Sequence, residues 1–318
     1  MHAASVKIVF KLKITLLQLC VFLRAKKLEK QKVLVVGLGE IGRPLFELLK
    51  ESGCFQVYGL DVDEKKMAEL KQNVEMLPQK VDILHICIPY QSKAAFIDNV
   101  VGYAKKYQPK LLIINSTVPP KTTTEISKSC KCPISHSPIF GTHKNLDYMK
   151  WEIRRWTKLV GAVDAPASEA TCKHFAKAGI NCKVLKSPIE TELAKLFETI
   201  YSAWMIIFFQ EMHRISKHFG ADLDAIAGVI EQIHRVRLDR PLWYPGVIGG
   251  HCLIPNTELL LKSYDSEFLR LILKSNEKRK EEIKDKSICE EMEKIKRRAE
   301  ALQKDLMKLL EHSQEKSS

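Results

Sequence analysis

The sequence predicts an α/β fold: a doubly wound parallel sheet, then an all-helical domain and a C-terminal coiled-coil-like helix. Short apolar runs at Val33–Val36, Ile83–Ile88 and Leu111–Asn115 alternate with helical segments, as in a parallel sheet buried on both faces. The glycine-free stretch Ile189–Phe219 places its apolar residues at helical spacing. From Ile288 to Leu309 apolar residues alternate at spacings of four and three, which indicates a coiled-coil or bundle seam.

A glycine-rich turn follows the first strand. Gly37, Gly39 and Gly42 have G-x-G-x-x-G spacing and open a helix over 41–50, and a second strand over 56–60 ends at Asp61. The glycines permit a tight turn, a close approach of pyrophosphate to the backbone, and close packing of helix on strand. A terminal aspartate suits the ribose 2′-hydroxyl and repels a 2′-phosphate. We therefore expect a Rossmann-type domain that binds NAD in preference to NADP. The candidate cofactor-binding residues are Gly37, Gly39, Ile41, Gly42, Asp61, Lys66, Pro89 and Ser116.

The remaining elements continue the alternation. Further helices are expected over 64–77, 94–107 and 122–130, outer strands over 158–163 and 183–185, and helices over 223–233 and 259–282 around a loop at 240–255. The expected domains are an N-terminal extension (1–30), the NAD-binding Rossmann domain (31–187), a helical dimerisation and catalytic domain (188–284), and a C-terminal helix and tail (285–318).

Composition narrows the class of protein. The 318 residues suffice for about two domains, and 45% hydrophobic residues with 28% charged is ordinary for a globular chain. The formal net charge of +13 comes without interleaved basic and aromatic residues, so we do not expect nucleic acid as a partner. We expect the positive charge to attract an anionic cofactor and a small anionic substrate instead. Nine cysteines form no even framework, and Cys130 and Cys132 stand too close for a usual zinc site. We expect a cytoplasmic protein without a metal.

Residues 1–30 differ from the rest. The apolar run Ile14–Leu23 is flanked by lysines and arginines but is too short to span a bilayer, and Arg24 stands where a signal peptide would have a small residue. We expect this extension to be a dispensable helix or an over-long reading of the start of the protein. The alternative is a peripheral membrane anchor.

Five motifs occur in order along the chain. They are GLGEIGRPL at Gly37–Leu45, ICIP at Ile86–Pro89, STVPPKTT at Ser116–Thr123, ELAKLFET at Glu192–Thr199 and PGVIGGHC at Pro245–Cys252. Over 33–280 the chain thereby resembles the UDP-glucose and GDP-mannose dehydrogenase family, the nucleotide-sugar dehydrogenases. The resemblance implies NAD-linked, two-step oxidation of a sugar primary alcohol to the carboxylate, by a homodimer built on the helix at 189–219.

The resemblance also implies roles for single residues. Cys252 would attack the aldehyde to form a thiohemiacetal and then a thioester, because a thiolate is both a strong nucleophile and a good leaving group. Lys195 would stabilise alkoxide charge, and Thr117 would hold water or substrate beside the nicotinamide. The implied substrate-binding residues are Thr199, Gly249, Gly250 and Asn256.

The departures from the family pattern leave other functions open. Ile139 replaces a glutamate used near the hydrolytic water, Thr199 an asparagine, and Asn256 an aspartate. The family's third, nucleotide-binding domain is also expected to be missing. One alternative is a one-step hydroxyacid-type dehydrogenase with Lys195 as acid/base and Cys252 as a bystander. The other is a non-catalytic NAD-binding or scaffold protein, with self-association through the C-terminal seam.

Overall fold

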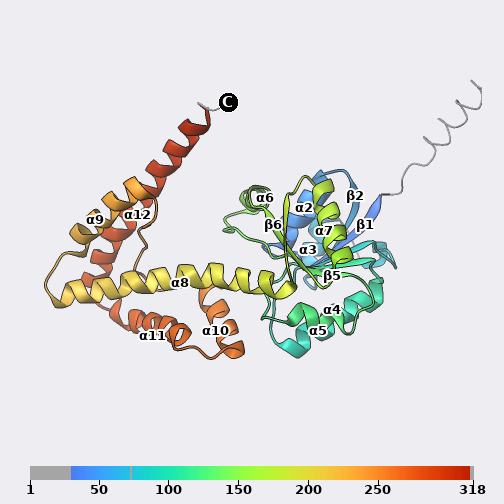
Figure 1. The fold of residues 1–318 in the computed structure, drawn as a ribbon, viewed down its shortest axis with the longest axis horizontal. Coiled ribbons are helices and arrows are strands. Elements are labelled where there is room, and N and C mark those ends of the chain that lie inside the picture. Colours follow the sequence, from blue (N-terminus) through green and yellow to red (C-terminus); the bar gives the residue numbers. More distant parts are fainter. Residues whose placement is uncertain (1–29, 72–73, 316–318) are drawn as a thin grey trace, which may run out of the picture. The chain divides into compact units, whose positions relative to one another are not determined.

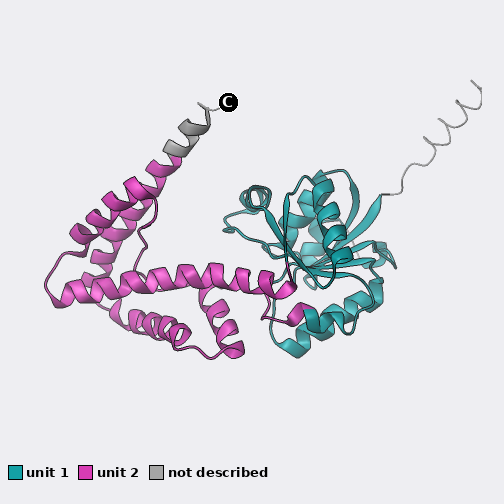
Figure 2. Ribbon diagram, viewed as in Figure 1, with its two compact units in different colours: residues 1–116, 124–185 teal, residues 117–123, 186–318 magenta. Residues whose placement is uncertain are grey.

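The computed structural model describes residues 30–71 and 74–315, with side chains through residue 307. The expectations for residues 1–29 lie outside the described residues. The chain divides into two compact units (Figure 2): unit 1 contains 30–116 and 124–185, and unit 2 contains 117–123 and 186–315. The turn at 117–123 thus belongs to the helical unit, although it directly follows a strand of the sheet.

Unit 1 is built on a seven-stranded sheet of order β2-β1-β3-β4-β5-β6-β7. The strands are β1 (Gln31–Val36), β2 (Phe55–Leu60), β3 (Ile83–Ile86), β4 (Leu111–Ile114), β5 (Ile134–His136), β6 (Lys158–Ala162) and β7 (Cys182–Leu185). All pairs are parallel except β5 with β6, which is antiparallel. The doubly wound α/β prediction is confirmed, but a fully parallel sheet was wrong, because the chain re-enters the sheet at β6 in the opposite direction.

Helices cover both faces of this sheet. They are α2 (Gly42–Glu51), α3 (Glu64–Glu69), η1 (Val74–Met76), α4 (Lys93–Tyr107), α5 (Thr122–Ser127), α6 (Leu146–Arg155) and α7 (Ala165–Lys177). Figure 1 shows α4 on one side of the sheet and α2 with α7 on the other. The helix expected over 64–77 stops early: Lys71 has a φ of 53°, which a continuing α-helix does not allow. Strand β5 and helices α6 and α7 were not anticipated from the sequence.

Unit 2 is helical. It contains α8 (Pro188–His218), α9 (Leu223–Arg237), α10 (Leu253–Ser263), α11 (Glu267–Glu282) and α12 (Lys286–Glu315). One core cluster joins α8 to α10 and α11, and a second joins α8 and α9 to α12. Helices α9 and α12 lie side by side (Figure 1). The C-terminal seam predicted from the sequence therefore packs within its own chain: Met292, Ile295 and Leu302 are buried in unit 2.

Among the helices that the structure describes, none is both long enough and apolar enough to cross a membrane.

Candidate functional site

The candidate cofactor site of unit 1 is the glycine turn between β1 and α2. Gly37 has a φ of +89°, and a Cβ there would lie 2.6 Å from the carbonyl oxygen of Cys87. A Cβ at Gly42 would lie 1.7 Å from the carbonyl oxygen of Gly37, so helix and turn meet backbone to backbone. A Cβ at Gly39 would meet nothing within 4 Å. The turn is thus closed at the first and third glycines and open at the second, as a bound pyrophosphate at the start of α2 requires.

Asp61 stands at the end of β2, facing this turn. One carboxylate oxygen accepts the backbone N–H of Leu38 at 2.6 Å, the other accepts that of Asp63 at 2.9 Å, and Lys66 Nζ lies 3.3 Å away. Burial raises the pKa of Asp61, but the two backbone donors and Lys66 outweigh it, so the pKa is lowered and the group stays anionic. Lone pairs remain on both oxygens for ribose hydroxyls. The residues present therefore fit an adenosine ribose.

Pro89 and Ser116 lie beyond the carboxyl ends of β3 and β4. The Ser116 hydroxyl donates to the carbonyl oxygen of Ile88 at 2.6 Å, which ties the two strand ends together. In an open parallel sheet, ligands bind at the strand ends where the chain order reverses, here between β1 and β3. The sequence-predicted cofactor residues, Gly37, Gly39, Ile41, Gly42, Asp61, Lys66, Pro89 and Ser116, all belong to unit 1 at or near this edge.

A second group of candidate residues lies within unit 2, on and around α8. Glu192, fully buried, accepts hydrogen bonds from the backbone N–H groups of Lys121 at 2.7 Å and Thr123 at 2.8 Å, and from the Thr123 hydroxyl at 2.7 Å. Lys121 has a φ of 74°, in the left-handed region that glycine adopts more easily. The carboxylate thus holds a strained turn, and that turn begins with Thr117.

Lys195 and Thr199 follow Glu192 at intervals of three and four residues, so the three share one face of α8. The Lys195 side chain is only 13% exposed, and its Nζ lies 3.3 Å from a carboxylate oxygen of Glu198. The Thr199 hydroxyl donates to the carbonyl oxygen of Leu196 and accepts a hydrogen bond from the amide of Asn256 at 3.1 Å. This contact joins the α8 face to the first turn of α10.

Cys252 caps that same turn. It is exposed, and its carbonyl oxygen accepts the backbone N–H of Asn256 at 2.9 Å. Before it, Gly249 and Gly250 are exposed, and a Cβ at either would meet nothing within 4 Å. The thiol therefore stands in an open stretch at a helix N-terminus, where the helix dipole favours negative charge. By contrast, burial raises the pKa of the Cys87 thiol to about 12, which makes that cysteine inert.

Ile139 and Asn256 stand where the resembled family has carboxylates, and neither side chain can activate water as a base. Ile139 is 4% exposed and belongs to the apolar core of unit 1. Asn256 is 9% exposed, and its side-chain amide donates a hydrogen bond to the Thr199 hydroxyl. An amide is no general base at neutral pH.

Three buried polar residues have long-range contacts that the sequence did not predict. Glu192 lay inside a motif, but its role depends on contacts with a turn 69 to 71 residues away. Gln210 and Asn276 lie on helices and bind the loop before Cys252. A polar residue within an apolar stretch of α8 was a usable signal for Gln210.

Comparison with known proteins shows which dehydrogenases this chain is similar to. A sequence model of the UDP-glucose/GDP-mannose dehydrogenase family, central domain, matches residues 189–278. The UDP-N-acetyl-D-mannosamine dehydrogenase of Methanocaldococcus jannaschii is 26% identical over 287 residues, which cover 78% of this chain and 65% of that protein. The chain is therefore similar to the nucleotide-sugar dehydrogenase family. It spans about two thirds of the length of this relative.

Other matches concern the NAD-binding domain and the fold. Residues 20–116 match the D-isomer specific 2-hydroxyacid dehydrogenase, NAD binding domain, which confirms the expected NAD-binding domain. The UDP-D-ManNAc dehydrogenase of Pyrococcus horikoshii has a similar fold, with a TM-score of 0.64 at 20% identity over 77% of this chain and 68% of that one. The 3-hydroxyisobutyrate dehydrogenase of Mycobacterium tuberculosis has a TM-score of 0.57 at 13% identity, covering 80% of this chain and 94% of the other.

Proposed function

We propose that this protein is an NAD-dependent dehydrogenase that oxidises the primary alcohol of a nucleotide sugar, of the UDP-N-acetylhexosamine class on which its relatives are named. The observation that carries the proposal is the α8 face. Lys195 and Thr199 lie one turn apart, and Asn256 binds Thr199 from the helix that begins at Cys252. A cation and a thiol are thereby placed on two helices joined by a direct hydrogen bond.

The proposed chemistry assigns each group a task. Bound NAD would supply the hydride acceptor for both oxidations. Lys195, little exposed and cationic, would stabilise negative charge on the substrate oxygen as the alcohol becomes an aldehyde. The Cys252 thiolate would add to the aldehyde carbon to form a thiohemiacetal, and the second oxidation would convert this to a thioester. Water would then release the carboxylate and the thiolate. Thr117 would orient substrate or water from its held turn.

The water-dependent step is the weak one in this chain. Removing a positioned acid or base costs about 10²- to 10⁴-fold in rate. Because Ile139 is buried in an apolar core and Asn256 binds Thr199, neither supplies the missing base. The two oxidations should therefore outrun hydrolysis, and a covalent adduct on Cys252 should accumulate.

Intact-protein mass spectrometry during turnover tests this proposal. With NAD and UDP-N-acetyl-D-mannosamine, we expect NADH together with an acyl adduct that maps to Cys252. Cys252→Ser should abolish the adduct, and Lys195→Ala should slow the first oxidation. Steady NADH formation without an adduct, at full rate in Cys252→Ala, would contradict the thioester mechanism.

That last outcome would favour the second candidate, a one-step hydroxyacid-type dehydrogenase. The observation favouring it is the loss of both carboxylates while Lys195 remains on α8. Here Lys195 would act as the acid/base and Cys252 would take no part. One NADH per substrate, with 3-hydroxyisobutyrate or a similar hydroxyacid, would distinguish it from the two NADH expected for the nucleotide sugar.

A further inference from the structure

The loop from Asp239 to Cys252 joins α9 to α10 without regular secondary structure. Its backbone groups cannot be paired by a helix or sheet ladder, so buried ones need side-chain partners. Ile248 is 5% exposed and sits in the core formed by α8, α10 and α11. It is the last buried residue before Cys252, since Gly249, Gly250 and His251 are exposed.

Asn276 of α11 pairs with both backbone groups of Ile248. Its Oδ1 accepts the Ile248 N–H at 2.7 Å, and its Nδ2 donates to the Ile248 carbonyl oxygen at 3.1 Å. Asn276 is 1% exposed, so each bond is shielded from water. One amide thus replaces the two backbone partners that a neighbouring strand would give this residue.

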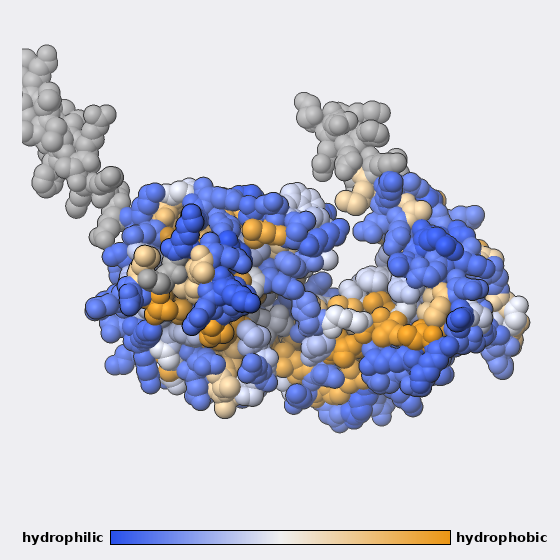
Figure 3. All heavy atoms as spheres, turned by 180° about the vertical axis from the view of Figure 1, so that it is seen from behind, coloured by the Kyte–Doolittle hydropathy of each residue, from blue (hydrophilic) through white to orange (hydrophobic). Residues whose placement is uncertain are grey.

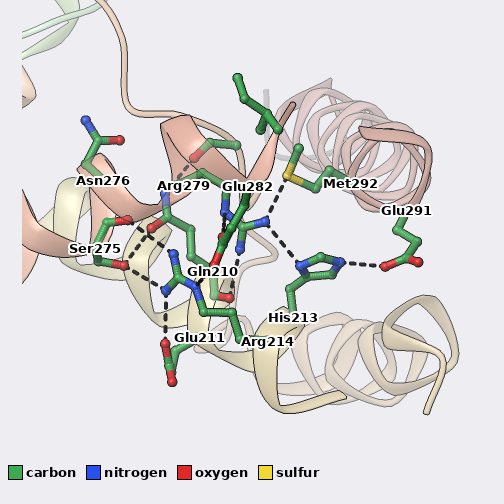
Figure 4. Close-up of polar contacts among 12 residues, drawn as sticks. Gln210, Glu211, His213, Arg214, Ser275, Asn276, Arg279, Glu282, Glu291 and Met292 are labelled. Atoms are coloured by element: carbon green, nitrogen blue, oxygen red, sulfur yellow. Dashed lines mark hydrogen bonds and ion pairs between the residues drawn. The ribbon is translucent and has the colours of Figure 1, made fainter. Parts of the chain in front are cut away.

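Gln210 of α8 adds a second point of attachment. Its Nε2 donates to the carbonyl oxygen of Gly246 at 2.7 Å, and its Oε1 accepts the hydroxyl of Ser275 at 2.7 Å. Ser275 precedes Asn276 on α11, so the two attachments share one polar cluster, whose members are labelled in Figure 4. Arg279, fully buried, extends the cluster by donating to the backbone carbonyl oxygen of Gln210 at 2.9 Å.

Cys252 is thereby held from both sides. Ile248 anchors the chain four residues before the thiol, and Asn256 anchors it four residues after, through Thr199. Between the anchors lie Gly249 and Gly250, where an added Cβ would meet nothing within 4 Å. Without the Ile248 anchor, the glycines would let the thiol leave the N-terminus of α10.

We propose that Asn276 is a positioning residue for Cys252, holding the thiol at the start of α10. The role matters for catalysis only if the proposed function is correct, but the positioning itself does not depend on turnover. Because Cys252 is already exposed, releasing the loop gains little access and chiefly removes the stabilising helix terminus from the thiolate. Loss of Asn276 should therefore slow the reaction of this thiol with an alkylating reagent.

Asn276→Asp makes this effect depend on pH. At pH 8.5 the carboxylate still accepts the Ile248 N–H but repels the Ile248 carbonyl oxygen. At pH 5 the protonated acid can donate to that oxygen and restore both bonds. Asn276→Leu removes both bonds at either pH. Asn145→Asp, at the exposed N-cap of α6 in unit 1, is the matched control for an added carboxylate.

The measurement is the rate of iodoacetamide modification of Cys252 in the full chain, followed by peptide mass spectrometry and expressed as variant over wild type. We expect Asn276→Asp to be slower by about fivefold at pH 8.5, equivalent to one hydrogen bond of about 1 kcal/mol, and equal to wild type at pH 5. In Asn276→Leu, Cys252 should be modified more slowly than in wild type at both pH values. In Asn145→Asp, the rate should equal that of wild type at both. A ratio of one at pH 8.5, or the same reduction at both pH values, would overturn the proposal. Failure to turn over nucleotide sugars would count against the proposed function and leave this measurement unaffected.

Discussion

At the scale of single residues, we expect cofactor choice to depend on the pair formed by Asp61 and Lys66. Asp61 is held by two backbone donors and stays anionic, which favours a ribose hydroxyl over a 2′-phosphate. Lys66, 3.3 Å away and partly exposed, offsets part of that negative charge. Its screening should make the preference for NAD smaller than Asp61 alone would give.

We therefore expect wild type to bind NAD at least about tenfold tighter than NADP, which corresponds to about 1.4 kcal/mol. Asp61→Ala should narrow this ratio, and Lys66→Ala should widen it by about two- to fivefold, as for a partly exposed ion pair of about 1 kcal/mol or less. Titration of both cofactors against each variant checks this. A narrower ratio in Lys66→Ala would mean that Lys66 itself binds the cofactor more than it screens Asp61.

Asn256 gives a second prediction at this scale. In Asn256→Asp the new carboxylate can accept the Thr199 hydroxyl, so the contact between α8 and α10 can persist with its direction reversed. A carboxylate there also restores a potential base beside the thioester. We expect the Cys252 adduct to decay about 10-fold or more faster than in wild type, within the range for a positioned base. Single-turnover mass spectrometry measures the decay; an unchanged lifetime would show that Asn256 lies off the path of water.

At the scale of elements, the apolar spacing of α12 predicted a packed helix face but not which helices it packs against. Its spacing of apolar residues suits a coiled coil, yet Ile295 and Leu302 are buried against α8 and α9. Ion pairs from Arg298 to Asp224 and Glu231 of α9 support the same packing. Removing residues 285–318 would therefore open a core, which makes that truncation unsuitable for testing how the chain assembles.

Ile295→Ala should lower the free energy of unfolding by about 2 to 5 kcal/mol, because the side chain is fully buried and leaves a cavity. The exposed Gln303→Ala on the same helix should change it by less than about 0.5 kcal/mol. Urea denaturation measures both. If Ile295→Ala instead alters the oligomeric state at unchanged stability, the seam acts between chains.

At the scale of the whole molecule, the long helix α8 has an apolar stripe that its own unit does not cover. Phe197, Tyr201, Phe208 and Ile215 are 50% to 58% exposed and lie four, seven and seven residues apart, on one face. Figure 3 shows hydrophobic residues gathered on the face of unit 2 seen there. Exposed apolar areas of this kind mark protein interfaces.

We expect a homodimer that depends on this stripe. Tyr201→Glu combined with Phe208→Glu should yield a folded monomer in light scattering at micromolar concentration, because both side chains are largely exposed. Val236→Glu, at an even more exposed position on α9, is the control and should stay dimeric. A dimer in the double variant would exclude the α8 stripe as the interface.

Buried histidines of unit 1 contribute to the loss of stability in acid. Burial lowers the pKa of His85 to about 4 and that of His136 to about 3, from 6.5 for a free side chain. The unfolded chain therefore takes up these protons first, so stability present above pH 6.5 is lost as the pH falls toward 4. We expect about 2 kcal/mol less stability per histidine at pH 5 than at pH 7, by urea denaturation. Equal free energies of unfolding at pH 5 and pH 7 would contradict the lowered pKa values of His85 and His136.

The sequence by itself determined the local and collinear features. The glycine spacing with Asp61 predicted the NAD-binding turn, and the apolar runs predicted most strands, because neighbours along the chain decide both. It predicted a strand at 158–163, but not β5 or the antiparallel direction of β6, which depend on pairing between residues such as Ser135 and Ala162.

Only the tertiary structure decided which distant residues meet. Glu192 holds the turn that begins at Thr117, Asn276 holds the loop before Cys252, and α12 packs on its own chain. The physical reason is that a buried polar group must find a partner wherever the fold provides one, and an apolar helix face can be covered by any partner of the right shape. The spacing of residues in the sequence shows which polar groups and apolar faces require partners, and the packing of the helices decides which residues those partners are.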